Sequence, residues 1–290
     1  MIASVTIVEL SLVLFAVAIV AGMLGSLLGL GGGFVIVPVL TLVFHLDIRL
    51  AIGTSIVAVA ATSSAGAARN VSQSITNLRV ATFLALATTI GAVSGALLSG
   101  VFDARFLFGL FGIVLAISGL QMLRHSRRTF SRAPSKVAPA AGSEGRLVRR
   151  LALDSAYYDQ AERTEVPYVV ANTGLGLGLM YLAGGISGLL GIGSGVLKVP
   201  AMDLAMHIPM KVSSATSNLL IGLTAAASAV VYFSRGDIDP LIAGPVALGV
   251  LLGATQGARL LAGIRADRLR VLFVTALIVV ATQMLWKAIG

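Results

Sequence analysis

Long apolar runs follow one another along almost the whole chain, and they limit its fold more than any other feature. The runs over residues 5–28 and 80–99 each have the roughly 20 residues that a helix needs to cross a bilayer. With 57% hydrophobic and 11% charged residues, the chain cannot hide its apolar surface in a soluble domain. Backbone groups in lipid need internal hydrogen bonds, which helices supply. We therefore predict an all-α integral membrane protein. Its first run lacks a basic flank, so we expect a retained segment and not a cleaved signal peptide.

The two halves of the chain resemble each other at a constant interval of 162 residues. Gly29 aligns with Gly191, and Pro38 aligns with Pro200. Further matched pairs are Gly31 and Gly193, Gly33 and Gly195, His45 and His207, Thr54 and Thr216, Ser55 and Ser217, Thr62 and Thr224, and Gly91 and Gly253. This register predicts a tandem duplication. Residues 1–123 and 167–290 form two transmembrane repeats, and residues 124–166 link them.

Each repeat contains five apolar segments. They cover residues 5–28, 34–44, 50–68, 80–99 and 106–123 in the first half, and 168–190, 196–206, 212–233, 241–261 and 269–286 in the second. The second segment of each half has only about eleven residues, against the roughly 20 of a spanning helix. The sequence leaves two arrangements open for it: a full crossing, or a re-entrant hairpin with the first segment that meets its mate near the midplane.

The basic residues predict how the repeats are oriented. Nine of the 21 Lys and Arg residues lie in the linker, and cytoplasmic loops collect such residues. With the linker in the cytoplasm, an odd number of crossings per half also places the basic cluster at 265–270 inside. Equivalent loops then face opposite sides, so the repeats are inverted and both termini lie outside.

Basic cytoplasmic loops are enough to explain the net charge of +9, so we do not expect nucleic acid as a partner. Binding of lipid headgroups by the linker is the alternative.

Charges of alternating sign over residues 152–165 predict a short surface helix there. The sequence is compatible with a homo-oligomer and does not determine the oligomeric state.

Glycine-rich stretches interrupt the apolar sequence at matching places in the two repeats. They read GLGGGFVIVP and GIGSGVLKVP. Paired breaks of this kind indicate a transport site, because broken helices can present free N–H groups to an anion near the midplane. The candidate residues are Gly31, Gly32, Gly33, Gly193, Ser194 and Gly195. The alternative is that the glycines only permit close helix packing, which we expect of Gly91 and Gly253.

Polar side chains near the breaks extend this candidate substrate site. Lys198 stands where the other repeat has Ile36, and a lysine at this depth needs a partner or a cavity. It could neutralise a bound anion, or instead snorkel toward the interface or pair with Asp203. Further candidates at the start of each third segment are Thr54, Ser55, Thr216, Ser217 and Asn218. His45 and His207 end the short segments, where they could carry protons or serve as interfacial residues.

We find no signature of an enzyme in the sequence. The glycine stretches lack the Lys-Ser/Thr of a phosphate-binding loop and the strand-helix context of a dinucleotide site. There is no cysteine, so disulfides and thiolate metal sites are excluded. We expect neither a cofactor nor a metal. Ion-driven transport or passive conduction remains.

The repeated glycine element and the Thr-Ser pair about sixteen residues after each proline resemble the sulfite exporter TauE/SafE family. The resemblance covers essentially the whole chain. It implies a permease of the bacterial inner membrane that exports sulfite or a related organosulfonate, with a small anion and the lipid bilayer as partners. Ser194 departs from the pure glycine run of the first repeat. An anion channel, or a permease for a different small organic anion, is the alternative.

Overall fold

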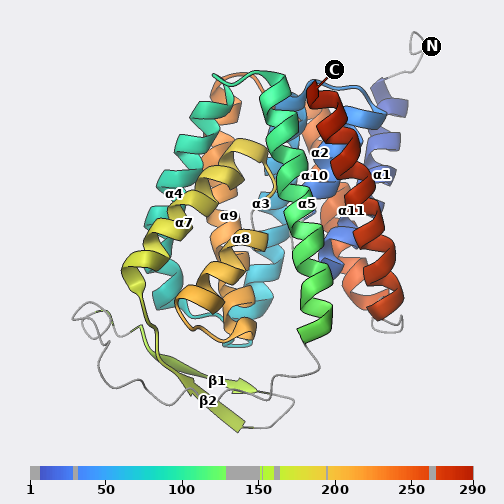
Figure 1. The fold of residues 1–290 in the computed structure, drawn as a ribbon. Helices are drawn as coiled ribbons and strands as arrows, with labels where there is room; N and C mark the ends of the chain where they lie inside the picture. The colour runs from blue at the N-terminus through green and yellow to red at the C-terminus, as the bar shows by residue number, and fades with distance from the viewer. Residues whose placement is uncertain are drawn as a thin grey trace.

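The computed structural model describes residues 7–28, 32–128, 151, 153–159, 164–193, 195–260 and 266–289. These residues form a bundle of helices with a small β-hairpin beyond one end (Figure 1). The first half contains α1 (Ile7–Leu28), α2 (Gly33–Pro38), η1 (Val39–Val43), α3 (Ile48–Ser72), α4 (Leu78–Ser99) and α5 (Ala104–Arg128). The second half contains α7 (Thr173–Leu190), α8 (Gly195–Pro200), η2 (Ala201–Ala205), α9 (Met210–Ser234), α10 (Pro240–Leu260) and α11 (Ala266–Ile289). The ten predicted apolar segments are therefore confirmed as helices.

Each short second segment is an α-helical turn that widens into a π-helical turn after its proline. Proline lacks an N–H and clashes with the preceding turn, so an ordinary α-helix cannot continue undisturbed through it. In the first half, the N–H of Phe44 donates to the carbonyl of Val39, five residues back, at 3.3 Å. The hydroxyl of Thr41 also donates to the carbonyl of Val37 at 2.8 Å. Together α2 and η1 have 11 residues. At 1.5 Å per residue they reach about 16 Å, or half of a bilayer core.

The prediction of a surface helix over residues 152–165 is wrong. The described residues there form β1 (Ser155–Asp159) and β2 (Thr164–Tyr168), which pair antiparallel. Tyr157 lies opposite Val166, and aromatic and β-branched residues favour such cross-strand pairs. The all-α description therefore holds for the membrane helices and not for the linker.

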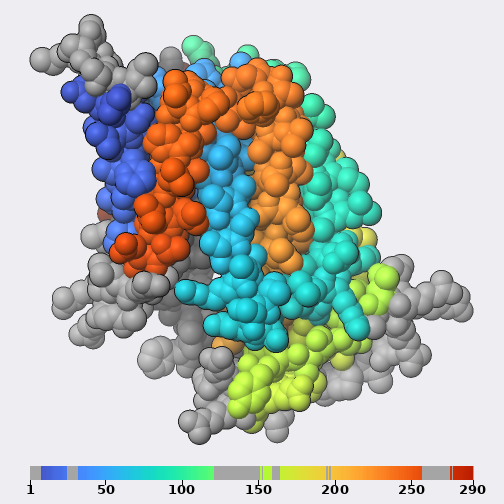
Figure 2. All heavy atoms as spheres, turned by 180° about the vertical axis from the view of Figure 1, so that it is seen from behind, coloured from blue at the N-terminus to red at the C-terminus, as the bar shows by residue number. Residues whose placement is uncertain are grey.

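The two halves interleave, because the first helix of each packs along the fourth helix of the other. Thus α1 lies against α10 and α4 against α7, while α3 pairs with α9 and α5 with α11. Figure 2 shows α1, α10, α3, α9 and α4 side by side on one face. A Cβ at Gly91 or Gly253 would collide with the backbone of Tyr181 or Ile19, so these glycines permit close helix contact, as predicted.

The loops sort to opposite ends of the bundle. Helix α1 begins at the end where α11 finishes, and the hairpin lies beyond the other end (Figure 1). At the first of these ends, Arg235 donates to Ser99 Oγ (3.0 Å), and Arg49 donates to the carbonyl of Phe102 (3.0 Å). Helices α5 and α11, which occupy matching places in the two halves, run in opposite directions (Figure 1).

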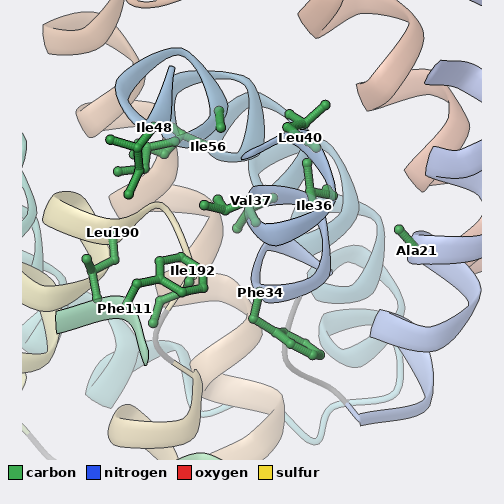
Figure 3. Packing of buried hydrophobic residues seen from close by; sticks show 14 of the residues in the cluster. Ala21, Phe34, Ile36, Val37, Leu40, Ile48, Ile56, Phe111, Leu190 and Ile192 are labelled. Atoms are coloured by element: carbon green, nitrogen blue, oxygen red, sulfur yellow. The ribbon is translucent and has the colours of Figure 1, made fainter. Parts of the chain in front are cut away.

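Four helices are long and apolar enough to cross a membrane, namely α3, α4, α7 and α9, counting only the described residues. Large apolar side chains on their outer faces are exposed, among them Leu86, Leu182 and Val230. An apolar belt of this extent on a bundle suits contact with lipid. The buried core surrounds α2 and η1, where Ile36, Val37 and Leu40 meet side chains from several other helices (Figure 3).

Candidate functional site

The two glycine breaks meet inside the bundle. The hydroxyl of Ser55, on α3, lies 2.8 Å from the carbonyl of Gly191 and 3.2 Å from that of Gly33. A Cβ added at Gly33 would lie 2.6 Å from the Gly191 oxygen. The end of α7 and the start of α2 are therefore in direct contact, and a side chain from α3 joins them. This arrangement brings the predicted site residues Gly33 and Ser55 together.

Backbone conformation explains why glycine occupies the break positions. Gly32, Gly191 and Gly193 have φ values of 71°, 69° and 71°, in the left-handed region that favours glycine. Gly191 has this conformation immediately after the last residue of α7, where it ends the helix. Gly31 and Ser194, two of the predicted site residues, lie outside the described residues.

Lys198 is completely buried in α8, three residues after Gly195. Its Nζ donates to Thr224 Oγ1 at 2.9 Å. The hydroxyl of Thr224 in turn donates to the carbonyl of Leu220 at 2.8 Å. Among the described residues, the acceptor for this ammonium is therefore a neutral hydroxyl on α9. The alternative in the sequence analysis was the carboxylate of Asp203. A cation buried with so little compensation is costly.

The two Thr-Ser pairs are not gathered into one site. Thr216 lies at the hairpin end of α9, where its Oγ1 accepts from the N–H of Asn77 at 3.2 Å. Thr54 lies near the opposite end, because its neighbour Gly53 packs against the carbonyl of Asp237. The structure therefore brings Ser55 to the glycine breaks and leaves the two threonines apart. Asn218 is partly exposed.

Besides that of Thr76, two buried hydroxyls have no hydrogen-bond partner among the described residues. They belong to Thr54 and Ser217, whose side chains are at most 1% exposed. Their repeat mates Thr216 and Ser55 do have partners, so the duplicated positions differ between the halves. A buried hydroxyl left unpaired is unfavourable, and a bound ligand would supply what it lacks.

His45 and His207 are exposed at the ends of the short segments, and not at the glycine breaks. Both have left-handed φ values, of 54° and 56°. After His45, the N–H of Leu46 donates to the carbonyl of Leu40 at 3.0 Å, a bond that closes the helix end. The structure thus gives each histidine a place in a helix terminus, and their role in proton coupling stays a prediction.

The linker is anchored to the bundle through Asn77, which sequence reasoning did not identify. Its Nδ2 lies 2.8 Å from the hydroxyl of Tyr168 and 3.0 Å from the carbonyl of Leu153. Burial raises the pKa of Tyr168, and the hydrogen bond from Asn77 partly opposes the rise. The N–H of Ala171 also donates to the carbonyl of Met206 at 3.0 Å, which joins the chain after β2 to the end of η2. The loop after α3 therefore holds the linker and the end of β2 against the bundle.

Thr224 is the second residue that the sequence did not assign to the site. The sequence feature that could have identified it is its match to Thr62 in the other repeat. The hydroxyl of Thr62 donates to the carbonyl of Ala58 at 3.0 Å. Lys198 and Thr224 lie on different helices, so their contact depends on how α8 packs against α9.

Comparisons with known proteins cover almost the whole chain, and they agree that it is similar to membrane transporters. The family model described as sulfite exporter TauE/SafE matches residues 14–284. A probable membrane transporter protein of Bacillus subtilis (strain 168), YunE, is 26% identical over 96% of this chain and 98% of its own length. A probable membrane transporter protein of Xylella fastidiosa (strain 9a5c) is 29% identical over 92% of this chain and 93% of its own. A third relative, MJ0441 of Methanocaldococcus jannaschii, is 24% identical over 94% of both chains and is also named a probable membrane transporter protein. No solved structure matches.

Proposed function

Because the chain belongs to the sulfite exporter TauE/SafE family, we propose that it is a permease that exports a small sulfur-containing oxyanion. Sulfite and organosulfonates are the substrates in question, and the bacterial inner membrane is the location. The family makes the chain a membrane transporter, and the relatives named above carry transporter names without a substrate. The choice of an oxyanion therefore depends on the chemistry of the buried site.

The burial of Lys198 carries this proposal. On insertion scales, a lysine at the centre of a membrane helix costs about 2.5–3.5 kcal/mol. The equivalent residue Ile36 is buried and apolar, so the repeated scaffold does not need a charge at this place. An oxyanion would neutralise the ammonium and accept its hydrogen bonds. The hydroxyl of Ser217 has no partner among the described residues and is the repeat mate of the Ser55 hydroxyl at the breaks, so it could donate to the same anion.

We further propose that the two halves are inverted repeats with the linker in the cytoplasm. The opposite directions of α5 and α11 support this, as does the reciprocal pairing of first and fourth helices. Transporters of this kind bind substrate where discontinuous helices meet at the repeat interface. The contact between Gly33 and Gly191 is such a meeting point.

An anion channel is the competing function. A channel needs a continuous hydrated path lined by polar groups. Around α2, the described core is formed by apolar side chains such as Val37, Phe111 and Ile192 (Figure 3). This favours a carrier that encloses its substrate. A permease for a different small organic anion would use the same buried lysine, so only measurement of flux separates the substrates.

Flux into proteoliposomes tests the proposed function directly. Purified protein should carry sulfite, sulfoacetate or taurine faster than empty liposomes do, and saturably. The matched arms are chloride, a sugar and a monovalent cation, each with and without a pH gradient. Flux of sugar or cation with none of any oxyanion would overturn the assignment. Flux that does not saturate with any anion would favour the channel.

A further inference from the structure

The hydrogen bond between Lys198 and Thr224 points to a role for Thr224 that rests on the function proposed above. We propose that Thr224 is a positioning residue that fixes the Lys198 ammonium for the anion and does not touch the anion itself. The bond joins α8 to α9 at 2.9 Å, and both side chains are completely buried.

The hydrogen bonds of the Thr224 hydroxyl explain why Thr224 would position the lysine and not contact the anion. Thr224 Oγ1 lies 2.8 Å from the carbonyl of Leu220 and 3.0 Å from that of Ile221, so its single hydrogen is committed to the helix backbone. A hydroxyl has one hydrogen and two lone pairs. What remains of Thr224 is an acceptor, which suits an ammonium and repels an anion. Thr224 can therefore act on an anion only through Lys198.

The ammonium keeps donors for a ligand. An ammonium has three N–H groups, and Thr224 accepts one of them. In the described part of the chain, Lys198 makes no other recorded hydrogen bond. Two N–H groups are thus left for an oxyanion that presents at least two oxygens, as both sulfite and sulfonates do. The bond to Thr224 reduces the freedom of a long side chain, so less entropy is lost when the anion binds.

The other repeat supplies a matched control. Thr62 occupies the equivalent position and makes the equivalent bond to a helix carbonyl, at 3.0 Å from Ala58. The residue equivalent to Lys198 there is Ile36, which has no ammonium to position. Loss of the Thr62 hydroxyl removes the same kind of helix bond in the half where isoleucine stands in place of the lysine.

A double-mutant cycle read by sulfite binding tests the proposal. We expect Thr224→Val to raise the Kd for sulfite by about tenfold, the scale of one hydrogen bond to a charged group. Thr224→Ser, which keeps the acceptor, should restore most of the affinity, and Thr62→Val should leave it unchanged. In a Lys198→Met background, Thr224→Val should have no further effect, because its action passes through the lysine. Melting temperatures measured without sulfite would identify a variant that is misfolded.

The possible outcomes separate this inference from the proposed function. If the wild-type protein binds sulfite and Thr224→Val binds it equally well, the positioning role is overturned and the function stands. Additive losses in the double variant would also overturn it, because Thr224 would then act without Lys198. If neither sulfite nor a sulfonate binds to the wild-type protein, the proposed function fails and the inference fails with it.

Discussion

At the scale of single residues, the two repeats differ in charge at a pair of equivalent buried positions. Lys198 and Ile36 occupy equivalent buried positions, yet only one of them carries an ammonium. Among the described residues, the hydroxyls of Thr54 and Ser217 have no partner, whereas those of their mates Thr216 and Ser55 do. A duplicated scaffold with one modified half can keep its packing while gaining a binding site on one side. Substitutions at these pairs can therefore separate folding from binding.

Lys198→Met should retain folding and lose anion binding. Methionine keeps the length and apolar contacts of the lysine stem but removes a buried charge, so we expect a melting temperature that is equal or higher. Affinity for sulfite should fall at least tenfold, while Lys198→Arg should retain part of it. Ile36→Met is the matched control and should change neither property. Wild-type flux through Lys198→Met would show that the lysine is not the counter-charge, and failure to fold would indicate that its bond to Thr224 is structural.

Gly33→Ala should destabilise the protein. The added methyl group would lie 2.6 Å from both the Gly191 oxygen and Val59 Cγ2, so the two breaks would have to separate. Overpacking of this kind costs about 1–3 kcal/mol, and we expect a lower melting temperature together with reduced flux. Gly178→Ala is the control, since a Cβ there meets nothing within 4 Å. Equal melting temperatures for the two variants would contradict direct contact between the breaks.

At the scale of elements, hydropathy predicts the helices well because it is a local property of the sequence. All ten segments appear, and the short ones begin where glycine interrupts the apolar run. The hairpin was missed because its charges alternate in the same way on a strand and on a surface helix. Its identity depends on pairing between Tyr157 and Val166, which lie in different strands. The partner of Lys198 was missed for a similar reason, since the sequence does not specify the packing of α8 on α9.

Asn77 should prove to be the anchor of the hairpin. Asn77→Ala removes the bonds to Tyr168 and Leu153, and also the cap that accepts from the N–H of Val80 at 3.0 Å. Asn77→Ser keeps a capping oxygen but is too short to reach both linker acceptors. Amide exchange in β1 and β2 should therefore rise in both variants. Only Asn77→Ala should also lose the roughly 1 kcal/mol that a cap contributes. Unchanged exchange in both strands would show that the hairpin is held elsewhere.

At the scale of the whole molecule, the repeats combine into one bundle and not into two domains. Contacts between halves connect α1 with α10 and α4 with α7. The loops with Arg49 and Arg235 lie at one end, and Asn77 lies at the other with the linker. We propose that the end with the linker faces the cytoplasm, as the positive-inside rule predicts from the sequence.

The proposed topology predicts opposite accessibility for two exposed serines. Ser74 follows α3 near Asn77, and Ser234 is the last residue of α9, beside Arg235. The chain has no cysteine, so Ser74→Cys and Ser234→Cys each introduce a unique thiol. A membrane-impermeant thiol reagent on intact cells should label only Ser234→Cys, and permeabilised cells should show labelling of both. Labelling of Ser74→Cys on intact cells would refute the inverted arrangement.

The pairing of helices from different halves also delays helix packing during synthesis. Helix α1 is complete at residue 28, but its partner α10 begins only at residue 240. At about 5–20 residues per second, roughly 10–40 s pass before the two can meet. Helix α4 waits for α7 in the same way, so neither half can complete its packing alone. The bilayer must therefore keep the first half inserted and unassembled for most of the time that a ribosome spends on this chain.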